Sequence, residues 1–291
     1  MDEIESLAAR FEQHRPRLRA VAYRMLGSLT EADDAVQNAW LRLGRSEVDR
    51  IDNLGAWLTT VVARECLHTL RSRRHRREDE FGVRLPDVVI TEDEGLDPEK
   101  EALLADSVGL AMLVVLDTLT PAERLAFVLH DVFHMPFEDI AQLVGRSPVA
   151  ARQLASRARR RVEGAEVPSP DVDIARQREV VDAFFAASRA GRFDALVRIL
   201  DPEIVLRADL GPGKPAAVYR GVAQVVKLAR SPRGADVHPV LVNGVVGVVV
   251  TIDGRPSSIM SFTVASGKIV EIYGIRPDRA RGLTAIWPPK K

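Results

Sequence analysis

The residues best suited to chemistry in this chain are the arginines of residues 146–161, a stretch that holds six arginines and no acidic residue. Guanidinium groups bind phosphates and the edge of guanine through paired hydrogen bonds, and amide side chains bind adenine in the same way. Helical spacing turns Ala151, Leu154, Ala155 and Ala158 inward. The polar set that remains is the candidate nucleic-acid contact, and it comprises Ser147, Arg152, Gln153, Ser156 and Arg157.

A charge run often only solvates a surface helix, but the residues around this one indicate a helix-turn-helix. The sequence Thr-Pro-Ala-Glu at 120–123 is a capping box with a first-turn proline, so a helix is predicted over 121–132, followed by a break at 135–136. Gly145 ends the next helix and Ser147 caps the one after it. Two helices joined by a short turn with glycine are typical of a helix-turn-helix, whose second helix enters the major groove.

A second basic surface lies on a predicted long helix that Asn53 opens and that runs to Arg77. Cations at a helix C-terminus are favoured by the helix dipole, but their number here favours contact with backbone phosphates. Trp57 lies on the same side of this predicted helix as the apolar residues. This favours a place for its ring in the core over stacking on a base. His68 and His75 lack acid or cysteine partners at metal spacing and are interpreted as polar surface residues, and no metal is expected in the chain. The candidate phosphate contacts are Arg64, His68, Arg71, Arg73, Arg74 and Arg77.

An acidic and amide face precedes this helix, on a helix that a capping box of Thr30 and Asp33 is predicted to begin. Its apolar residues share one side. The other side carries Asp33, Asp34, Gln37 and Asn38. Acids in a first turn are explained by the helix dipole alone, whereas Gln37 and Asn38 stabilise a helix little and need another role.

Length and composition exclude several classes of protein. The 291 residues suit two or three domains, and the formal net charge of zero hides an acidic stretch at 78–106 with eleven acids. The single cysteine, Cys66, excludes an internal disulfide and a cysteine-rich zinc site. The N-terminus lacks the apolar run of a signal peptide, and no apolar stretch reaches the length of a membrane helix. We therefore expect a cytoplasmic protein with no membrane contact.

The C-terminal part changes character after a proline-rich joint at 164–173. Two predicted helices separated by Gly191 are followed by runs rich in valine and isoleucine. These runs are divided by Asn243-Gly244, Asp253-Gly254 and Ser266-Gly267, which are typical of hairpin turns. The sequence therefore predicts an α+β domain with an antiparallel curved sheet at 174–283.

The segments TEADDAVQNAWLRL, NLGAWLTTVVARECLHTLRSRRHRRE and 119–162, in this order and spacing, resemble the two conserved domains of bacterial extracytoplasmic-function sigma factors. The resemblance implies two all-α domains: region 2 at 1–78, and region 4 at 106–163, with an acidic linker at 79–105 that regains helix near Glu99. It implies that Asp33, Asp34, Gln37 and Asn38 bind the β′ coiled coil of core RNA polymerase, and that the long helix captures the minus-10 element. Region 4 would bind the minus-35 element and the β flap.

The C-terminal domain resembles the SnoaL-like members of the NTF2-like cone fold, which the sigma-J type of sigma factor carries as an extension. Motif positions of that subgroup fall on Asp209, Gly211, Gly213, Lys214, Pro277 and Asp278. Relatives of this fold enclose a pocket that binds or converts a small molecule. Asp209 has no second carboxylate or histidine committed beside it, so a capped glycine turn is favoured over catalysis, and we expect a regulatory domain, no enzyme and no cofactor.

Two alternatives stay open at this point. A SnoaL-like enzyme or small-molecule-binding domain fused to a DNA-binding regulator would turn over a substrate or bind a ligand through residues 174–283. A regulator that binds operator DNA unaided would give the face at Asp33–Asn38 no role.

Overall fold

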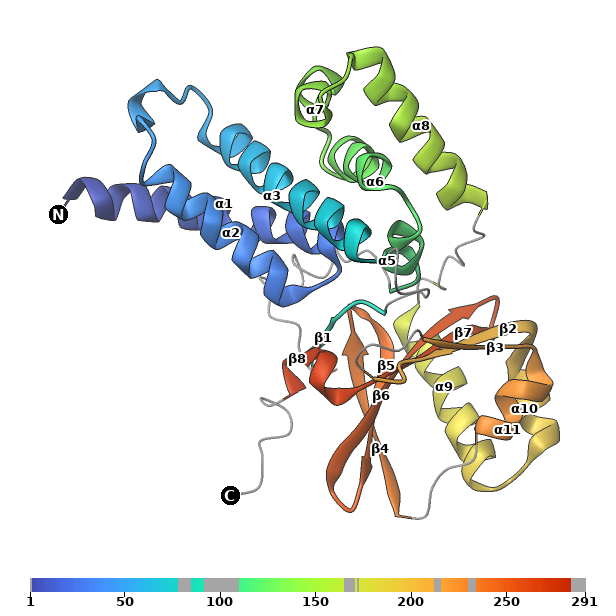
Figure 1. The fold of residues 1–291 in the computed structure, drawn as a ribbon. Helices are drawn as coiled ribbons and strands as arrows, with labels where there is room; N and C mark the ends of the chain where they lie inside the picture. Colours follow the sequence, from blue (N-terminus) through green and yellow to red (C-terminus); the bar gives the residue numbers. More distant parts are fainter. Residues whose placement is uncertain are drawn as a thin grey trace. The chain divides into compact units, whose positions relative to one another are not determined.

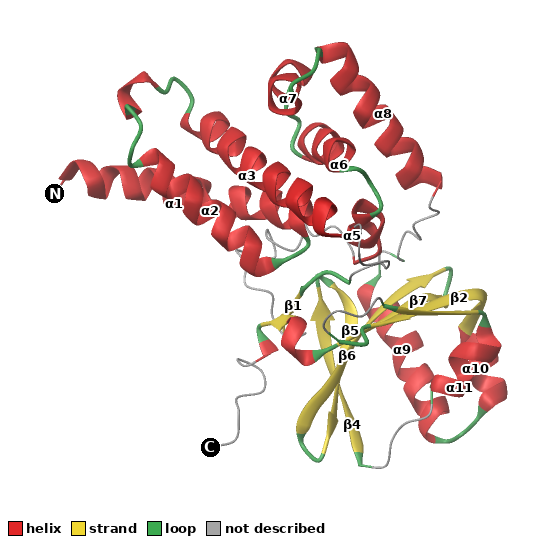
Figure 2. Cartoon of the chain, viewed as in Figure 1, coloured by secondary structure: helices red, strands yellow, loops and turns green. Residues whose placement is uncertain are grey.

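The computed structural model describes residues 2–77, 85–91, 110–164, 171, 173–211, 216–229 and 234–283 (Figure 1). Residues of the chain group into two compact units. One comprises Met1–Phe81 with Met112–Glu166, and the other comprises Gly82–Ala111 with Val167–Lys291. The first is helical and the second combines helices with a sheet (Figure 2). No helix among the described residues is long and apolar enough to cross a membrane.

Three helices form the N-terminal part of the helical unit: α1 (Asp2–Leu26), α2 (Leu29–Leu43) and α3 (Leu54–Arg77), with a 3-10 turn at Val48–Arg50. Their shared core contains the fully buried side chains of Leu18, Met25, Leu43 and Leu58. Asn53 caps α3 through a hydrogen bond from Ala56 N to its Oδ1 (3.0 Å), as predicted. The predicted N-cap of α2 was wrong by two residues, because Ser28 and not Thr30 is the N-cap and accepts from Glu31 N.

The helix-turn-helix is built from α5 (Leu110–Asp117), α6 (Pro121–Phe127), a π-helical turn (Val128–Val132), α7 (Phe137–Val144) and α8 (Pro148–Gly164). The predicted capping box at the start of α6 is present, and Gly145 ends α7 in the left-handed conformation with φ +69°. Ser147 accepts a hydrogen bond from Ala150 N (3.2 Å). Ile140, Ala151 and Ala155 are buried between these helices, which confirms the predicted inner face of α8.

The second unit packs three helices, α9 (Ile174–Arg189), α10 (Phe193–Ile199) and α11 (Val222–Leu228), on one face of a curved sheet. The aromatic core joins Phe184 and Phe185 of α9 to Phe262 of the sheet, with ring centroids 5.2–5.8 Å apart. The strands outside the linker are β2 (Leu200–Ala208), β3 (Ala217–Arg220), β4 (Ala235–Val242), β5 (Val245–Ile252), β6 (Arg255–Ala265), β7 (Lys268–Ile275) and β8 (Ala280–Arg281). This is the α+β layout that the SnoaL-like resemblance implies.

The three predicted hairpin turns are all present between β4 and β7. Asn243, Asp253 and Ser266 each adopt a positive φ of 50° to 53°, and each is followed by a glycine with φ between 71° and 75°. Positive φ at both central positions is the type I′ requirement, which is why asparagine, aspartate and glycine are found there. The four strands β4 to β7 therefore form an antiparallel meander, while β2 pairs with β7 in parallel.

A strand inside the linker is the main departure from the sequence analysis, which predicted an acidic linker at 79–105 and no strand within it. β1 (Val88–Thr91) lies between β4 and β8 in the sheet order, antiparallel to β4 and parallel to β8. Val88 and Ile90 are buried. The helix expected near Glu99 lies outside the described residues.

Glu123 is the polar residue on which the start of α6 depends. Its carboxylate accepts from Thr120 N (3.1 Å) and Thr120 Oγ1 (2.7 Å) and pairs with Arg161 Nη1 (3.0 Å). Burial by itself raises the pKa of Glu123, but the hydrogen bonds from Thr120 and the charges of Arg161 and Arg157 outweigh burial and lower the pKa. The native state thus favours the ionised carboxylate.

We predict that Glu123→Gln lowers the stability of the helical unit by about 1 kcal/mol at neutral pH, because the charged cap is lost. A lowered native pKa stabilises the fold above the ordinary glutamate value of about 4.3, and this stabilisation is lost as pH falls through the native pKa. The difference in the free energy of unfolding between the unaltered protein and Glu123→Gln should therefore become smaller below about pH 4. Calorimetric unfolding at several pH values measures it, with the exposed Glu138→Gln as the control. An equal difference at every pH would contradict the role of the charge.

Candidate nucleic-acid interface

The outward face of α8 gathers the residues predicted to contact DNA. Arg152, Gln153 and Arg157 are exposed and Ser156 is half-buried. Ser147 is exposed at the N-cap, where its hydroxyl oxygen is already used by Ala150 N. The first turns of α8 therefore present donors to solvent while its alanines hold the helix on the domain, as reading a major groove requires.

Arg152 is held by an aromatic stack that the sequence analysis did not find. Its guanidinium carbon lies 5.2 Å from the centre of the Phe137 ring, and the His130 ring stacks on the same Phe137 ring with 3.8 Å between centroids. His130 Nδ1 lies 3.1 Å from the carbonyl oxygen of Met135. Because a cation over an aromatic face is attracted to it, the stack restricts where the Arg152 guanidinium lies.

The basic run divides into two sets in the structure. Arg159 pairs with Asp131 (2.6 Å) and Arg161 with Glu123 (3.0 Å), so both arginines fasten α8 to the rest of its domain. Neither arginine was among the DNA contacts predicted from the sequence.

On α3, the exposed residues Arg64, His68 and Arg71 lie three or four positions apart and form one stripe. Arg73 is different: its Nη1 donates to the carbonyl oxygen of Leu26 (2.8 Å), and its guanidinium pairs with the Glu31 carboxylate. Arg73 thus joins α3 to the α1–α2 junction. Nothing is described for the Arg77 side chain, and Trp57 is half-buried.

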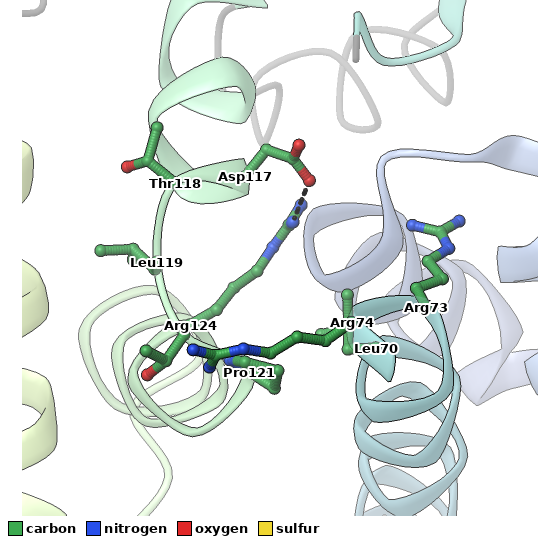
Figure 3. Close-up of a pocket in the computed structure, with 9 residues that line it drawn as sticks. Leu70, Arg73, Arg74, Asp117, Thr118, Leu119, Pro121 and Arg124 are labelled. Carbon is green, nitrogen blue, oxygen red and sulfur yellow. Dashed lines mark hydrogen bonds and ion pairs between the residues drawn. The ribbon is translucent and has the colours of Figure 1, made fainter. Parts of the chain in front are cut away.

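A cavity of about 250 Å³ lies where the C-terminal end of α3 meets α5 and α6 (Figure 3). Arg73 and Arg74 line it from α3, and Asp117 and Arg124 line it opposite, joined by an ion pair of 3.3 Å. Arg124 is buried and also donates twice to the carbonyl oxygen of Arg24, at 2.9 and 3.1 Å. Two of the predicted phosphate contacts therefore border region 4 in this arrangement.

The predicted polymerase face of α2 is also at the surface. Asp34, Gln37 and Asn38 are exposed, whereas Asp33 is half-buried and accepts from Arg19 Nε at 2.7 Å. Leu41, one turn further along the same face, is 50% exposed and was not among the predicted contacts.

The C-terminal motif residues form a turn. Asp209 N donates to the carbonyl oxygen of Gly274 (2.9 Å), and its carboxylate accepts from Gly211 N (2.9 Å), where φ is +108°. Asp278 pairs with Arg276 (2.6 Å) beside Pro277. Gly213 and Lys214 lie outside the described residues. The carboxylate of Asp209 thus caps a glycine turn, as favoured from the sequence.

One buried polar cluster of this domain was not predicted. Glu271 is buried, pairs with Arg207, and accepts from Tyr273 Oη at 3.1 Å. Burial and the Glu271 carboxylate raise the pKa of Tyr273, so the phenol stays protonated and keeps donating. Both carboxylate oxygens are therefore occupied by neighbouring side chains. Among the described residues no group of three His, Cys, Asp or Glu could hold a metal ion.

Comparisons with known proteins agree with this geometry. The models of sigma-70 region 2 and sigma-70 region 4 match residues 10–76 and 110–162. The chain is 40% identical over 291 residues to the ECF RNA polymerase sigma factor SigJ of Mycobacterium tuberculosis, covering 94% of this chain and 92% of that protein. It is 32% identical over 278 residues to the probable sigma factor SigI of the same species, covering 94% of each.

A crystal structure of Mycobacterium tuberculosis SigJ matches 97% of this chain and 100% of that chain, with a TM-score of 0.72 and 35% identity. The agreement spans both helical domains and the α+β domain. The chain therefore belongs to the extracytoplasmic-function family of RNA polymerase sigma factors, which bind core polymerase and promoter DNA.

Proposed function

We propose that three surfaces of this sigma factor divide the work of initiation. The outward face of α8 reads the minus-35 element, the Arg64, His68 and Arg71 stripe of α3 contacts the minus-10 strand, and the α2 face binds the β′ coiled coil of polymerase. The observation that carries this proposal is that each of these polar faces is exposed on a helix whose opposite face is buried in the core. Region 4 also contacts the β flap, and the protein acts in the cytoplasm.

The deciding experiment is multi-round transcription with core polymerase on a promoter library. The full chain should yield transcripts from a set of promoters that share two sequence elements. Transcripts that depend on Gln37 and Asn38 would support the polymerase face of α2. Silence on every promoter would contradict the proposal and favour a regulator that binds DNA unaided.

We further propose that the C-terminal domain regulates the chain by holding its linker and is not an enzyme. Asp87 Oδ1 pairs with Arg279 Nε (2.8 Å), and Arg279 also donates to the carbonyl oxygen of Leu85. Asn243 bonds Val89 twice, accepting from Val89 N (2.8 Å) and donating to its oxygen (2.9 Å). The linker segment at 85–91 is thus paired on both sides, and the C-terminal domain would regulate the chain by releasing this segment.

A glycine directly after β8 makes the close approach of the linker possible. A side chain on Gly282, where φ is +92°, would place its Cβ 2.4 Å from the carbonyl oxygen of Ile90. Only glycine fits such a distance to backbone. The chain therefore carries a glycine where the backbone of the linker comes closest. This supports the proposal that the linker and the C-terminal domain act together. A small molecule in the domain would act by changing this pairing.

For base reading, we predict that Arg152→Ala weakens promoter binding by about 1 to 3 kcal/mol on the preferred minus-35 sequence and relaxes specificity at one position. Arg71→Ala removes a phosphate contact, so it should weaken all promoters alike and reduce the salt dependence of binding. Holoenzyme affinity across minus-35 variants at several salt concentrations measures both. Equal losses on every sequence for Arg152→Ala would place this residue on the DNA backbone.

Phe137 should act through Arg152, so we predict that Phe137→Leu reproduces part of the Arg152→Ala loss of specificity. A cation over an aromatic ring contributes about 0.5–1 kcal/mol at an exposed site. Phe137→Tyr keeps the ring face and should restore the base preference. The readout is the ratio of affinities for two minus-35 sequences, which a merely destabilised domain would leave unchanged.

For the linker, we predict that Asp87→Ala raises transcription. Loss of the pair with Arg279 should weaken docking by about 1–2 kcal/mol, which multiplies the undocked fraction roughly five- to thirtyfold. The matched control is Asp278→Ala, which breaks the neighbouring pair with Arg276 without touching the linker. Equal transcript yields from Asp87→Ala and the unaltered chain would show that docking does not limit initiation.

A further inference from the structure

We propose that Val149 determines specificity by contacting the 5-methyl group of a thymine in the minus-35 element. This inference rests on the proposed role of α8 in the major groove and names a base that the polar residues do not read. Val149 is 61% exposed at the second residue of α8. It was not among the contacts predicted from the sequence.

The position of Val149 on the helix is fixed by the buried alanines. Ala151 and Ala155 are fully buried. Because successive residues of an α-helix are about 100° apart, Val149 is turned roughly 160° from Ala151 and points away from the core. It lies three and four residues before Arg152 and Gln153, so the three side chains share the outward face.

The chemistry of the major groove selects the partner of this side chain. Base edges there present nitrogen and oxygen donors and acceptors, and the thymine methyl is the one apolar group. An isolated exposed valine needs no explanation on an ordinary surface. Here it stands in the first turn of the recognition helix, whose N-terminal residues approach base edges most closely. A β-branched residue is also a poorer helix former than alanine, so the fold gains nothing from valine at this place.

Arg152 sets where that thymine lies. The stack on Phe137 fixes the side of the helix on which the guanidinium lies, 5.2 Å from the ring centre. Three residues of helix rise about 4.5 Å, close to the separation of neighbouring base pairs. The thymine read by Val149 therefore lies within about two base pairs of the base bound by Arg152.

The test uses holoenzyme reconstituted with the full chain and a promoter obtained from the transcription library. Each thymine of the minus-35 element is replaced in turn by deoxyuridine, which removes only the methyl group. At one position the unaltered protein should lose about fourfold in affinity, the effect of exposing one methyl-sized group. With Val149→Ala, the same replacement should have no effect, and Val149→Thr, which keeps one methyl, should retain part of it.

Val197→Ala is the matched control, because Val197 is 52% exposed on α10, far along the chain from α8. Holoenzyme with Val197→Ala should lose as much affinity on the deoxyuridine replacement as the unaltered protein does. Equal sensitivity of Val149→Ala and the unaltered protein would overturn the inference, as would a loss by Val149→Ala that is the same on every sequence. If the unaltered holoenzyme binds no promoter at all, the proposed function itself fails and the inference falls with it.

Discussion

A buried guanidinium must keep its hydrogen-bond partners, and in the helical unit that constraint falls on Arg124. Only 2% of this residue is exposed, and it is held by Asp117 and by the carbonyl oxygen of Arg24. Breaking such a pair by removing one partner costs several kcal/mol, since a charge is left without compensation. Arg124 fixes α6 against α1, and α6 in turn holds α8 through Glu123 and Arg161. The orientation of α8 therefore depends on Arg124, a residue that is buried away from the outward face of that helix.

The contacts between the two helical domains are polar as well as apolar. Arg17 Nη2 donates to the carbonyl oxygen of Phe133 (3.2 Å), and the Arg24 guanidinium carbon lies 5.1 Å from the centre of the Phe133 ring. Groups of this kind can exchange their partners for water when the surfaces part, so separation exposes less apolar area than a purely hydrophobic contact would. A sigma factor that has to place two domains on two promoter elements benefits from such a junction.

Local signals in the sequence were sufficient for most of the helices and turns. The capping box at Thr120, the left-handed Gly145 and the hairpin glycines each act through neighbours within four residues, so they can be recognised without a structure. Contacts between distant segments could not be recognised in this way. Arg73 was predicted to contact phosphate. Its partners in the structure, Leu26 and Glu31, lie more than forty residues away in the sequence, so the sequence alone does not reveal them. The stack of Arg152 on Phe137 crosses two helices, and β1 has only four residues, too few for a periodic pattern. The residue types at 88–91, valine, isoleucine and threonine, favour a strand, but the strand forms where the neighbouring strands β4 and β8 supply hydrogen bonds, and those partners lie far along the chain.

The place of β1 between β4 and β8 also ties the linker to the order of synthesis. β8 ends at Arg281, 190 residues after Thr91 at the end of β1. At about 5–20 residues per second, a ribosome needs roughly 10–40 seconds to add the intervening chain. Both helical domains are complete once Gly164 has been added, when β8 still lies more than a hundred residues ahead. A nascent chain consequently makes the β4 side of the linker's pairing first, and the β8 side can form only after about forty further residues have been added.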